Sequence, residues 1–197
     1  MASTEEHLVE IQKRVASIPP NAVAAELKRN GEALVEQRGS LGLHFAVGLL
    51  YARVGDFGSA AKMLNVALNI SGENKVVLGA LAFLFANQVG DDETALTYLK
   101  RRHKLDKKDP STLLIMAHCN LKLEKADEAL SLIGKAEKLT KDKLQLAYLK
   151  AQALVQLKRY DEALAIAETI STNAHPNAAD LSKTIQTQVA ANRASDS

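Results

Sequence analysis

The stretch Gly55-Asp56-Phe57-Gly58-Ser59-Ala60-Ala61 decides the fold, because three related stretches follow it along the chain. They are Gly90-Asp91-Asp92-Glu93-Thr94-Ala95-Leu96, Glu124-Lys125-Ala126-Asp127-Glu128-Ala129-Leu130 and Lys158-Arg159-Tyr160-Asp161-Glu162-Ala163-Leu164. The aligned alanines are Ala60, Ala95, Ala129 and Ala163, so the spacings are 35, 34 and 34. A fixed period in this range predicts an array of stacked repeats. Such arrays usually bind a partner along an extended surface, so the period favours binding over catalysis.

Composition narrows the fold class to packed helices. The chain has 197 residues, of which 47% are hydrophobic, and this is enough for one domain with a real core. Aromatic residues make up only 4% and the sequence has no Trp, which favours helices that pack closely through small residues. The net charge of +2 gives no reason to expect nucleic acid or a membrane surface as a partner.

Three local features predict a cytoplasmic protein. Cys119 is the single cysteine, so an internal disulfide is impossible and a reducing compartment is expected. Residues 1–6 are acidic and lack the apolar segment of a secretory signal. The longest apolar run, from Val76 to Ala86, is too short to cross a bilayer, so no membrane insertion is expected.

Each repeat is predicted to contain two helices, A and B, with the quoted stretch at the turn between them. The expected pairs are residues 41–54 with 58–70, 74–89 with 92–105, 110–123 with 126–139, and 142–157 with 160–171. Gly72 suits a helix end that needs positive φ, and Asp109 followed by Pro110 suits a helix start. His175-Pro176-Asn177 is expected to end the last pair.

The segments outside the array are also predicted to be helical. Residues 1–40 are expected to form an N-terminal helical pair, either a degenerate repeat or a cap, which a capping box of Ser3 and Glu6 opens. Residues 177–193 are expected to form a capping helix on the last repeat, and residues 194–197 a disordered tail. The capping helix would turn Leu181, Ile185, Val189 and Ala190 inward and Lys183, Gln186 and Asn192 outward.

The repeat length, the two-helix unit and the positions of small residues together resemble the tetratricopeptide repeat family. The family pattern is Trp-x2-Leu-Gly-x2-Tyr, then Ala-x3-Phe, then Pro. The first repeat matches it best, with His44-x2-Val47-Gly48-x2-Tyr51 followed by Ala60-x3-Leu64. The resemblance covers residues 41–176 as four repeats, 41–74, 75–109, 110–143 and 144–176. It implies an all-α, right-handed superhelical solenoid.

Small residues are expected where helices A and B of a repeat cross closely. On helix A these are Gly48, Ala117 and Ala151, and on helix B they are the four aligned alanines. The second repeat departs from the pattern, because Phe83 is expected at the position that a small residue normally takes.

The resemblance also implies a binding surface, because helix A of each repeat lines the concave groove in this family. The expected groove residues are Phe45, Leu49, Arg53, Val77, Ala80, Leu84, Asn87, Gln88, Ser111, Leu114, His118, Leu121, Lys122, Tyr148, Gln152 and Gln156. The N-terminal half of this set is mostly apolar and the C-terminal half can form hydrogen bonds. Such a groove suits an amphipathic helix or an extended peptide with apolar anchors.

The second helix A is apolar on every side, from Val76 to Phe85. A helix of this kind is normally buried all round, although one side of it should meet water in a solenoid. Three explanations stay open at this point. The N-terminal helices fold over the free side, a partner or a second copy of the chain covers it, or the groove is open and mildly adhesive.

The other candidate sites have structural explanations. The basic run Lys100–Lys108 fits the last turn of a helix, where cations meet the negative end of the dipole, better than a nuclear import signal. His118 and Cys119 are neighbours on a helix and therefore point apart, so they do not form a catalytic pair. The remaining histidines have no metal-binding spacing.

The sequence therefore predicts a protein without enzymatic activity, cofactor or metal. It would act as a scaffold, adaptor or chaperone that holds a segment of another protein in the groove, with homodimerisation left open. Two alternatives remain: a secretion or assembly chaperone that shields an apolar segment, and a structural subunit of a larger complex that uses its convex or terminal faces.

Overall fold

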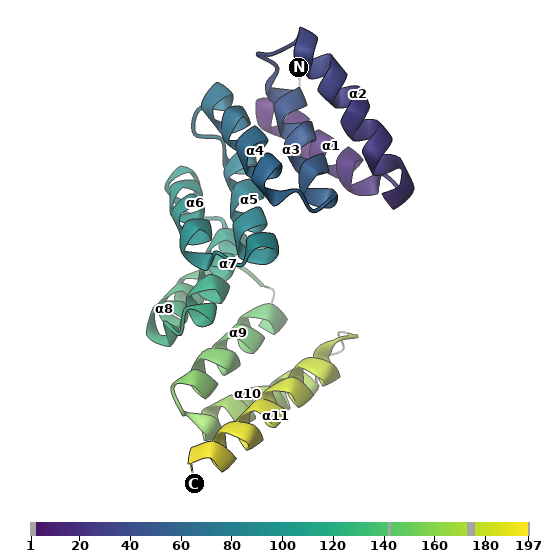
Figure 1. The fold of residues 1–197 in the computed structure, drawn as a ribbon. Coiled ribbons are helices and arrows are strands. Elements are labelled where there is room, and N and C mark those ends of the chain that lie inside the picture. The colour runs from purple at the N-terminus through teal and green to yellow at the C-terminus, as the bar shows by residue number, and fades with distance from the viewer. Residues whose placement is uncertain (1–2, 142, 173–175, 197) are drawn as a thin grey trace. The chain divides into compact units, whose positions relative to one another are not determined.

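The computed structural model describes residues 3–141, 143–172 and 176–196. All regular elements within these ranges are helices (Figure 1). They fall into two compact units, residues 1–107 and 108–197. The expected helix start at Asp142 and the expected break at His175 lie outside the described residues.

The first unit contains two helix pairs and two N-terminal helices. In chain order these are α1 (Thr4–Ser17), the 3-10 turn η1 (Pro20–Ala22), α2 (Val23–Glu36), α3 (Leu41–Arg53), α4 (Phe57–Ser71), α5 (Lys75–Phe83), the π-helical turn η2 (Leu84–Val89) and α6 (Asp92–Leu105). The α3 helix packs on α4, and α5 packs on α6. We propose that these two pairs are the first two repeats.

The two N-terminal helices pack on helices of the pairs that follow them. Along the described residues, α1 packs on α3 and α5, and α2 packs on α3. The predicted capping box is confirmed, since the Ser3 hydroxyl accepts from the Glu6 backbone and the Glu6 carboxylate accepts from the Ser3 backbone. The α1 helix buries Leu8, Ile11 and Val15 in the core of this unit.

The second unit contains α7 (Pro110–Lys122), α8 (Ala126–Glu137), α9 (Lys143–Gln156), α10 (Tyr160–Ser171) and α11 (Ala178–Asp196). The α7 helix packs on α8, α9 packs on α10, and α11 packs on both α9 and α10. We propose that the two pairs are the third and fourth repeats. As expected, Asp109 caps α7 with Pro110 at the first helical position.

The capping helix α11 differs from the prediction in two respects. It continues to Asp196, so the tail expected to be disordered from Ala194 is helical to that residue. Arg193 bonds Asp161 and lies over the Tyr160 ring, which ties the last turns of α11 to α10. Ala190 is exposed, because the inward stripe runs through Ser182, Ile185 and Val189. The Ser182 hydroxyl donates to the Ala167 carbonyl at 2.8 Å.

Each turn between helices A and B contains one residue with positive φ. These residues are Gly55, Gly90, Glu124 and Lys158, with φ of 84°, 79°, 59° and 58°. Their spacings along the chain equal those of the aligned alanines. The first unit therefore has glycine at this turn. In the second unit Glu124 and Lys158 adopt a left-handed conformation that is unfavourable for residues with a side chain.

The extra residue of the second repeat lies in its helix A. The interval from the cap of helix A to the turn is one position longer from Asn74 to Gly90 than from Ser40 to Gly55. The π-helical turn η2 accommodates the additional residue, since a π turn is wider than an α turn.

This insertion corrects the prediction for Phe83. Ala82 follows its cap Asn74 by the same interval as Gly48 follows Ser40, and Ala82 is only 1% exposed. Phe83 is 58% exposed and does not lie at the crossing with α6. The expectation that Phe83 replaces the small crossing residue is therefore wrong, and Ala82 takes that place.

Candidate partner-binding site

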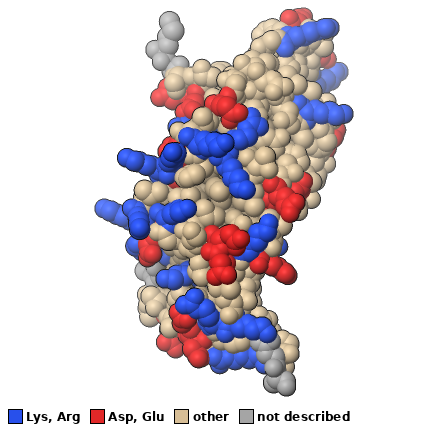
Figure 2. Space-filling view, turned by 90° about the vertical axis from the view of Figure 1, so that its left-hand side faces the viewer, with Lys and Arg blue, Asp and Glu red and all other residues tan. Residues whose placement is uncertain are grey.

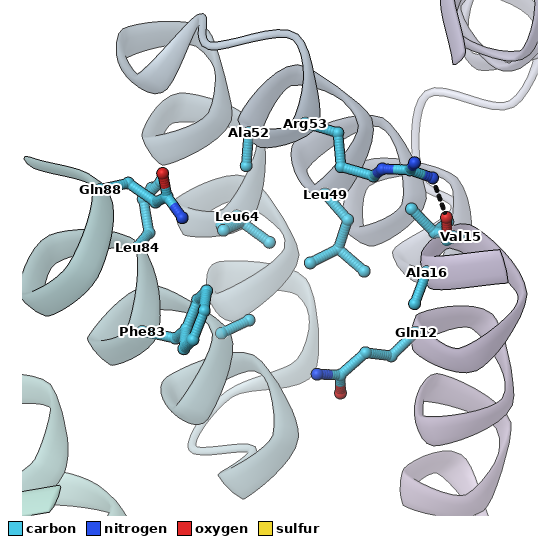
Figure 3. Close-up of a pocket in the computed structure, with 11 residues that line it drawn as sticks. Gln12, Val15, Ala16, Leu49, Ala52, Arg53, Leu64, Phe83, Leu84 and Gln88 are labelled. Atoms are coloured by element: carbon cyan, nitrogen blue, oxygen red, sulfur yellow. Dashed lines mark hydrogen bonds between the residues drawn. The ribbon is translucent and has the colours of Figure 1, made fainter. Parts of the chain in front are cut away.

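The first unit contains an open apolar cleft between α1 and η2, which we call the α1–η2 cleft (Figure 3). Its volume is about 370 Å³. Its lining residues are Gln12, Val15 and Ala16 from α1, Leu49, Ala52 and Arg53 from α3, Leu64 from α4, Ala80 and Phe83 from α5, and Leu84 and Gln88 from η2. Since α3 and α5 are the A helices of their pairs, the cleft lies on the helix A side of this unit.

The side chains of α5 and η2 give this cleft its character. Phe83 and Leu84 lie on one side, Ala16 and Gln12 lie opposite them on α1, and Leu49 lies between (Figure 3). Leu84 is 1% exposed and supports the wall, whereas Phe83 lines the cleft and is 58% exposed. A large aromatic face beside an apolar hollow can bury area against a partner that it cannot bury within the chain.

Two cations anchor α1 at the edges of this region. The Arg53 guanidinium donates to the Val15 carbonyl, which also accepts from the Ile18 backbone where α1 ends. At the other end of α1, the Lys75 ammonium lies 3.1 Å from the Glu5 carboxylate. That hydrogen bond and the negative charge of Glu5 raise the pKa of Lys75 above 10.5.

The second unit contains a cleft of about 320 Å³ with mostly hydrogen-bonding side chains, which we call the α7–α9–α11 cleft. It is lined by His118, Leu121 and Lys122 from α7, Gln152, Val155 and Gln156 from α9, and Gln188 and Asn192 from α11. The Gln156 amide donates to the Leu121 carbonyl at 2.8 Å, and the Gln152 amide donates to the Tyr148 hydroxyl at 3.0 Å.

Ten of the sixteen expected groove residues line these two clefts, five in each. They are Leu49, Arg53, Ala80, Leu84 and Gln88 in the first unit, and His118, Leu121, Lys122, Gln152 and Gln156 in the second. Asn87 and Ser111 are exposed outside both clefts, and Tyr148 is half-buried beside Gln152. The structure thus places ten of the sixteen residues in two clefts, one in each unit.

Three expected groove residues are buried in the core. Phe45 and Val77 have no exposed surface and Leu114 has almost none. Phe45 and Val77 pack in the core of the first unit and Leu114 in the core of the second. Their placement in the groove is therefore wrong, because the inner helices of a stack bury a wider stripe than the family geometry alone suggests.

Sequence reasoning missed the contributions of two terminal helices. Gln12, Val15 and Ala16 of α1 line the first cleft, and Gln188 and Asn192 of α11 line the second. Asn192 was expected to point outward. It follows Gln188 by about one helical turn, which puts both on one face of the helix, but this spacing does not distinguish that face from the others.

Different neighbours cover different sides of the apolar second helix A. The α1 helix covers part of α5, as the first explanation requires. On another side, the Phe85 ring stacks on Tyr98 with 5.7 Å between ring centroids. Phe83 remains exposed, so one side of this helix is covered by neither α1 nor α6.

Part of the basic run has structural roles in the first unit. Arg101 forms a bidentate pair with Glu73 at 2.6 Å, which raises the pKa of the guanidinium, and lies over the Tyr98 ring. Arg102, His103 and Lys104 occupy the last turn of α6, where the positive charges of Arg102 and Lys104 interact favourably with the negative end of the helix dipole. Figure 2 shows Lys and Arg side chains interspersed with Asp and Glu over the visible face.

Other chemistry finds little support in the described ranges. Cys119 is fully buried, while its neighbour His118 is exposed. The described residues include no group of three His, Cys, Asp or Glu side chains that could hold a metal ion. Within the same residues, none of the helices is both long enough and apolar enough to cross a membrane.

Comparison with solved structures identifies the fold. A tetratricopeptide repeat protein from Parabacteroides merdae has a TM-score of 0.80 and 14% identity, over 95% of this chain and 75% of that one. YrrB, described as a TPR protein with an unusual peptide-binding site, has a TM-score of 0.67 and 18% identity, over 88% and 84%. TTC0263, a thermophilic TPR protein from Thermus thermophilus, has a TM-score of 0.62 and 17% identity, over 95% and 100%.

Comparison with sequence families gives one partial match. The family of the anaphase-promoting complex, cyclosome, subunit 3 matches residues 90–170. No curated protein matches the sequence. Because the sequence identities to the solved structures are low, structural similarity to them establishes the fold alone. The predicted tetratricopeptide repeat fold is confirmed.

Proposed function

We propose that this chain is a non-catalytic interaction module, a scaffold, adaptor or chaperone that holds a peptide or helix of another protein by apolar anchors. The observation that carries the proposal is the α1–η2 cleft, where the exposed Phe83 ring borders an apolar hollow on the helix A side. YrrB, which shares the fold, is described as having a peptide-binding site, and this supports a peptide as the class of ligand.

The energetic argument rests on unburied apolar area. A buried aromatic side chain removes roughly 150–250 Å² from water, and each Å² is worth about 25 cal/mol. A partner side chain that enters the cleft would cover Phe83 and Leu49 together. Interface hot spots are commonly aromatic residues that sit in such pockets, so Phe83 is the proposed anchor on this side.

The two clefts suit different parts of a ligand. The α1–η2 cleft, with Leu49, Ala80 and Leu84, suits aliphatic or aromatic side chains. The α7–α9–α11 cleft offers the amides of Gln152 and Gln188 to the backbone of an extended segment. Each cleft is proposed as a site by itself.

The experiment that tests this function compares two exposed apolar residues of one unit. Phe83→Glu puts a charge in the cleft, and Val35→Glu puts the same charge on α2, where the native side chain is 66% exposed. Both should leave helicity unchanged, because neither native side chain is buried. Leu84→Glu is unsuitable, since a charge at that buried position would unfold the helix.

The readout is affinity capture from the source cells followed by mass spectrometry. A protein retained by the wild-type chain and by Val35→Glu, and lost with Phe83→Glu, is the expected result. The same set of captured proteins with all three chains would contradict the proposed site.

A role as a structural subunit is the second candidate. It is favoured by the match of residues 90–170 to a family described as a subunit of a multiprotein complex. In that case the chain expressed alone should aggregate or melt without cooperativity. A monomer with a cooperative melt would favour the interaction module. The single cysteine, Cys119, supports a reducing compartment, and we propose the cytoplasm for both functions.

A further inference from the structure

The α1 helix differs from the helices of the repeats in what it packs against. Each helix A of the first unit packs on the helix B that follows it, whereas α1 packs on α3 and α5, two A helices. In the resembled architecture this is the side on which a ligand is held. A helix of the chain itself therefore occupies part of the surface proposed for a partner.

The contact that α1 makes is a narrow apolar stripe. Leu8, Ile11 and Val15 are buried, at positions i, i+3 and i+7, while Gln12 and Ala16 beside them are exposed. A stripe of this width lets a helix pack on a surface through one side while its other sides face water, as a helix seated in a groove does. The surface below is shaped for it, because a Cβ atom added at Gly42 would lie 3.1 Å from the Ile11 Cδ1 atom.

Polar contacts hold the two ends of α1 to the same surface. Arg53 of α3 donates to a carbonyl in the last turn, and Lys75 of α5 pairs with Glu5 in the first turn. Both partners of the ion pair are about 40% exposed, so this contact exchanges readily with water or with another carboxylate.

Open space borders α1 along both halves of its length, on the side that faces α5 and η2. The α1–η2 cleft follows its C-terminal half. A second cleft of about 490 Å³ follows its N-terminal half and is lined by Ser3, Glu5, Glu6, Val9, Glu10, Lys13, Lys75 and Val76. Ile18 and Pro19, which have extended backbone conformations, then join α1 to η1 and separate it from α2.

We propose that α1 is a displaceable cover on a helix-binding face of α3 and α5. The partner it gives way to is an amphipathic helix of the same chemistry, with large aliphatic side chains at i, i+3 and i+7 and a carboxylate in its first turn. This inference rests on the proposed function and names its partner class and its regulation. Because α1 is part of the same chain, it competes with a partner helix at a high effective concentration. The apparent affinity for a partner helix is therefore reduced, and it is proportional to the fraction of chains in which α1 is released.

The test uses the full chain and a labelled peptide of residues 3–18 as the probe. In the chain, Leu8→Ala weakens the tethered helix at a fully buried position, and Val9→Ala is the matched control, since Val9 is 38% exposed on the same helix. Fluorescence anisotropy should show that the peptide binds the Leu8→Ala chain at least about tenfold more tightly than the wild-type or the Val9→Ala chain. Equal or absent binding to a folded Leu8→Ala chain overturns the proposal.

Hydrogen exchange on the unaltered chain keeps the proposal testable if Leu8→Ala does not fold. Amides of α1 should exchange faster than amides of α3, because α1 opens by itself. Exchange of both helices at one common rate overturns the proposal. So does a wild-type dimer whose two copies exchange α1, since the occupant would then be a second copy. If the peptide does not bind the Leu8→Ala chain but capture of a partner protein is still lost with Phe83→Glu, the proposal that α1 is a displaceable cover is wrong and the proposed function stands.

Discussion

Gly48 of α3 and Leu64 of α4 approach so closely that a methyl group at Gly48 would lie 2.8 Å from the Leu64 Cγ atom. The same methyl would be 3.2 Å from the Leu64 backbone nitrogen, so a shift of the side chain alone cannot relieve the contact. The crossing of the first helix pair therefore depends on the absence of a side chain at one position.

The first prediction is that Gly48→Ala destabilises the first unit by about 1–3 kcal/mol, because the two helices must move apart. Gly31→Ala is the matched control: Gly31 lies in α2 and an added Cβ atom would contact nothing within 4 Å. It should stabilise by about 0.5–1 kcal/mol through helix propensity. Urea unfolding followed by circular dichroism measures both, and equal effects would rule out the steric explanation.

The second prediction contrasts two neighbours at the π-helical turn. Phe83→Ala should change the free energy of unfolding by less than about 0.5 kcal/mol, because the ring is mostly in water. Leu84→Ala should cost about 2–5 kcal/mol, because it leaves a cavity at a buried position. Thermal melts of both variants measure the difference. The reverse order would mean that this helix has a regular α register.

The third prediction concerns the left-handed turn residues of the second unit. Glu124→Gly should stabilise that unit by about 0.5–1 kcal/mol, because glycine adopts positive φ without the steric cost that an L side chain bears. Glu128→Gly is the control, since Glu128 lies in the first turn of α8, where glycine should cost up to about 1 kcal/mol. Denaturation midpoints of the two variants should move in opposite directions.

The fourth prediction follows from two helix caps. Hydrogen bonds from Ser59 lower the pKa of Asp56 below 3.8, and hydrogen bonds from Thr94 do the same for Asp91. A carboxylate whose pKa is lower in the folded chain stabilises it above pH 3.8, and this stability is lost as the pH falls through the lowered value. Asn at both positions keeps an oxygen acceptor without the charge.

Acid unfolding of the double variant, Asp56→Asn with Asp91→Asn, checks this. Its free energy of unfolding should fall less steeply below pH 3.8 than that of the wild-type chain. Parallel curves would show that these two carboxylates do not contribute to the acid sensitivity.

The helices could be predicted from the sequence because their signals are local. Asp109 before Pro110 marks the start of α7, and the expected ranges of α6 and α10 agree with the structure to the residue. The small crossing residue of the first pair followed from the same pattern, since the period alone aligns Gly48 with its equivalents. The helix limits depend on neighbours a few positions away in the chain, and the crossing residue depends on a regular period.

The candidate site could be predicted only in part, because it depends on packing between segments distant in sequence. Nothing local shows that α1 lies on α3 and α5, or that Phe45 is fully buried. The exposure of Phe83 depends on where one extra residue is absorbed, and the longer spacing between Ala60 and Ala95 does not say which helix absorbs it. The side chains that α11 adds to the second cleft were missed for the same reason.

The π-helical turn has a consequence for protein engineering. Binding specificities are often transplanted between repeat proteins by copying the side chains at equivalent positions of helix A. In this chain, equivalent positions of the second helix A must be numbered in two ways. Up to Phe83 they are counted forward from the cap at Asn74, and after Phe83 they are counted backward from the turn at Gly90. A transfer made with a single uniform register would place every copied side chain after Phe83 on the wrong face of the helix.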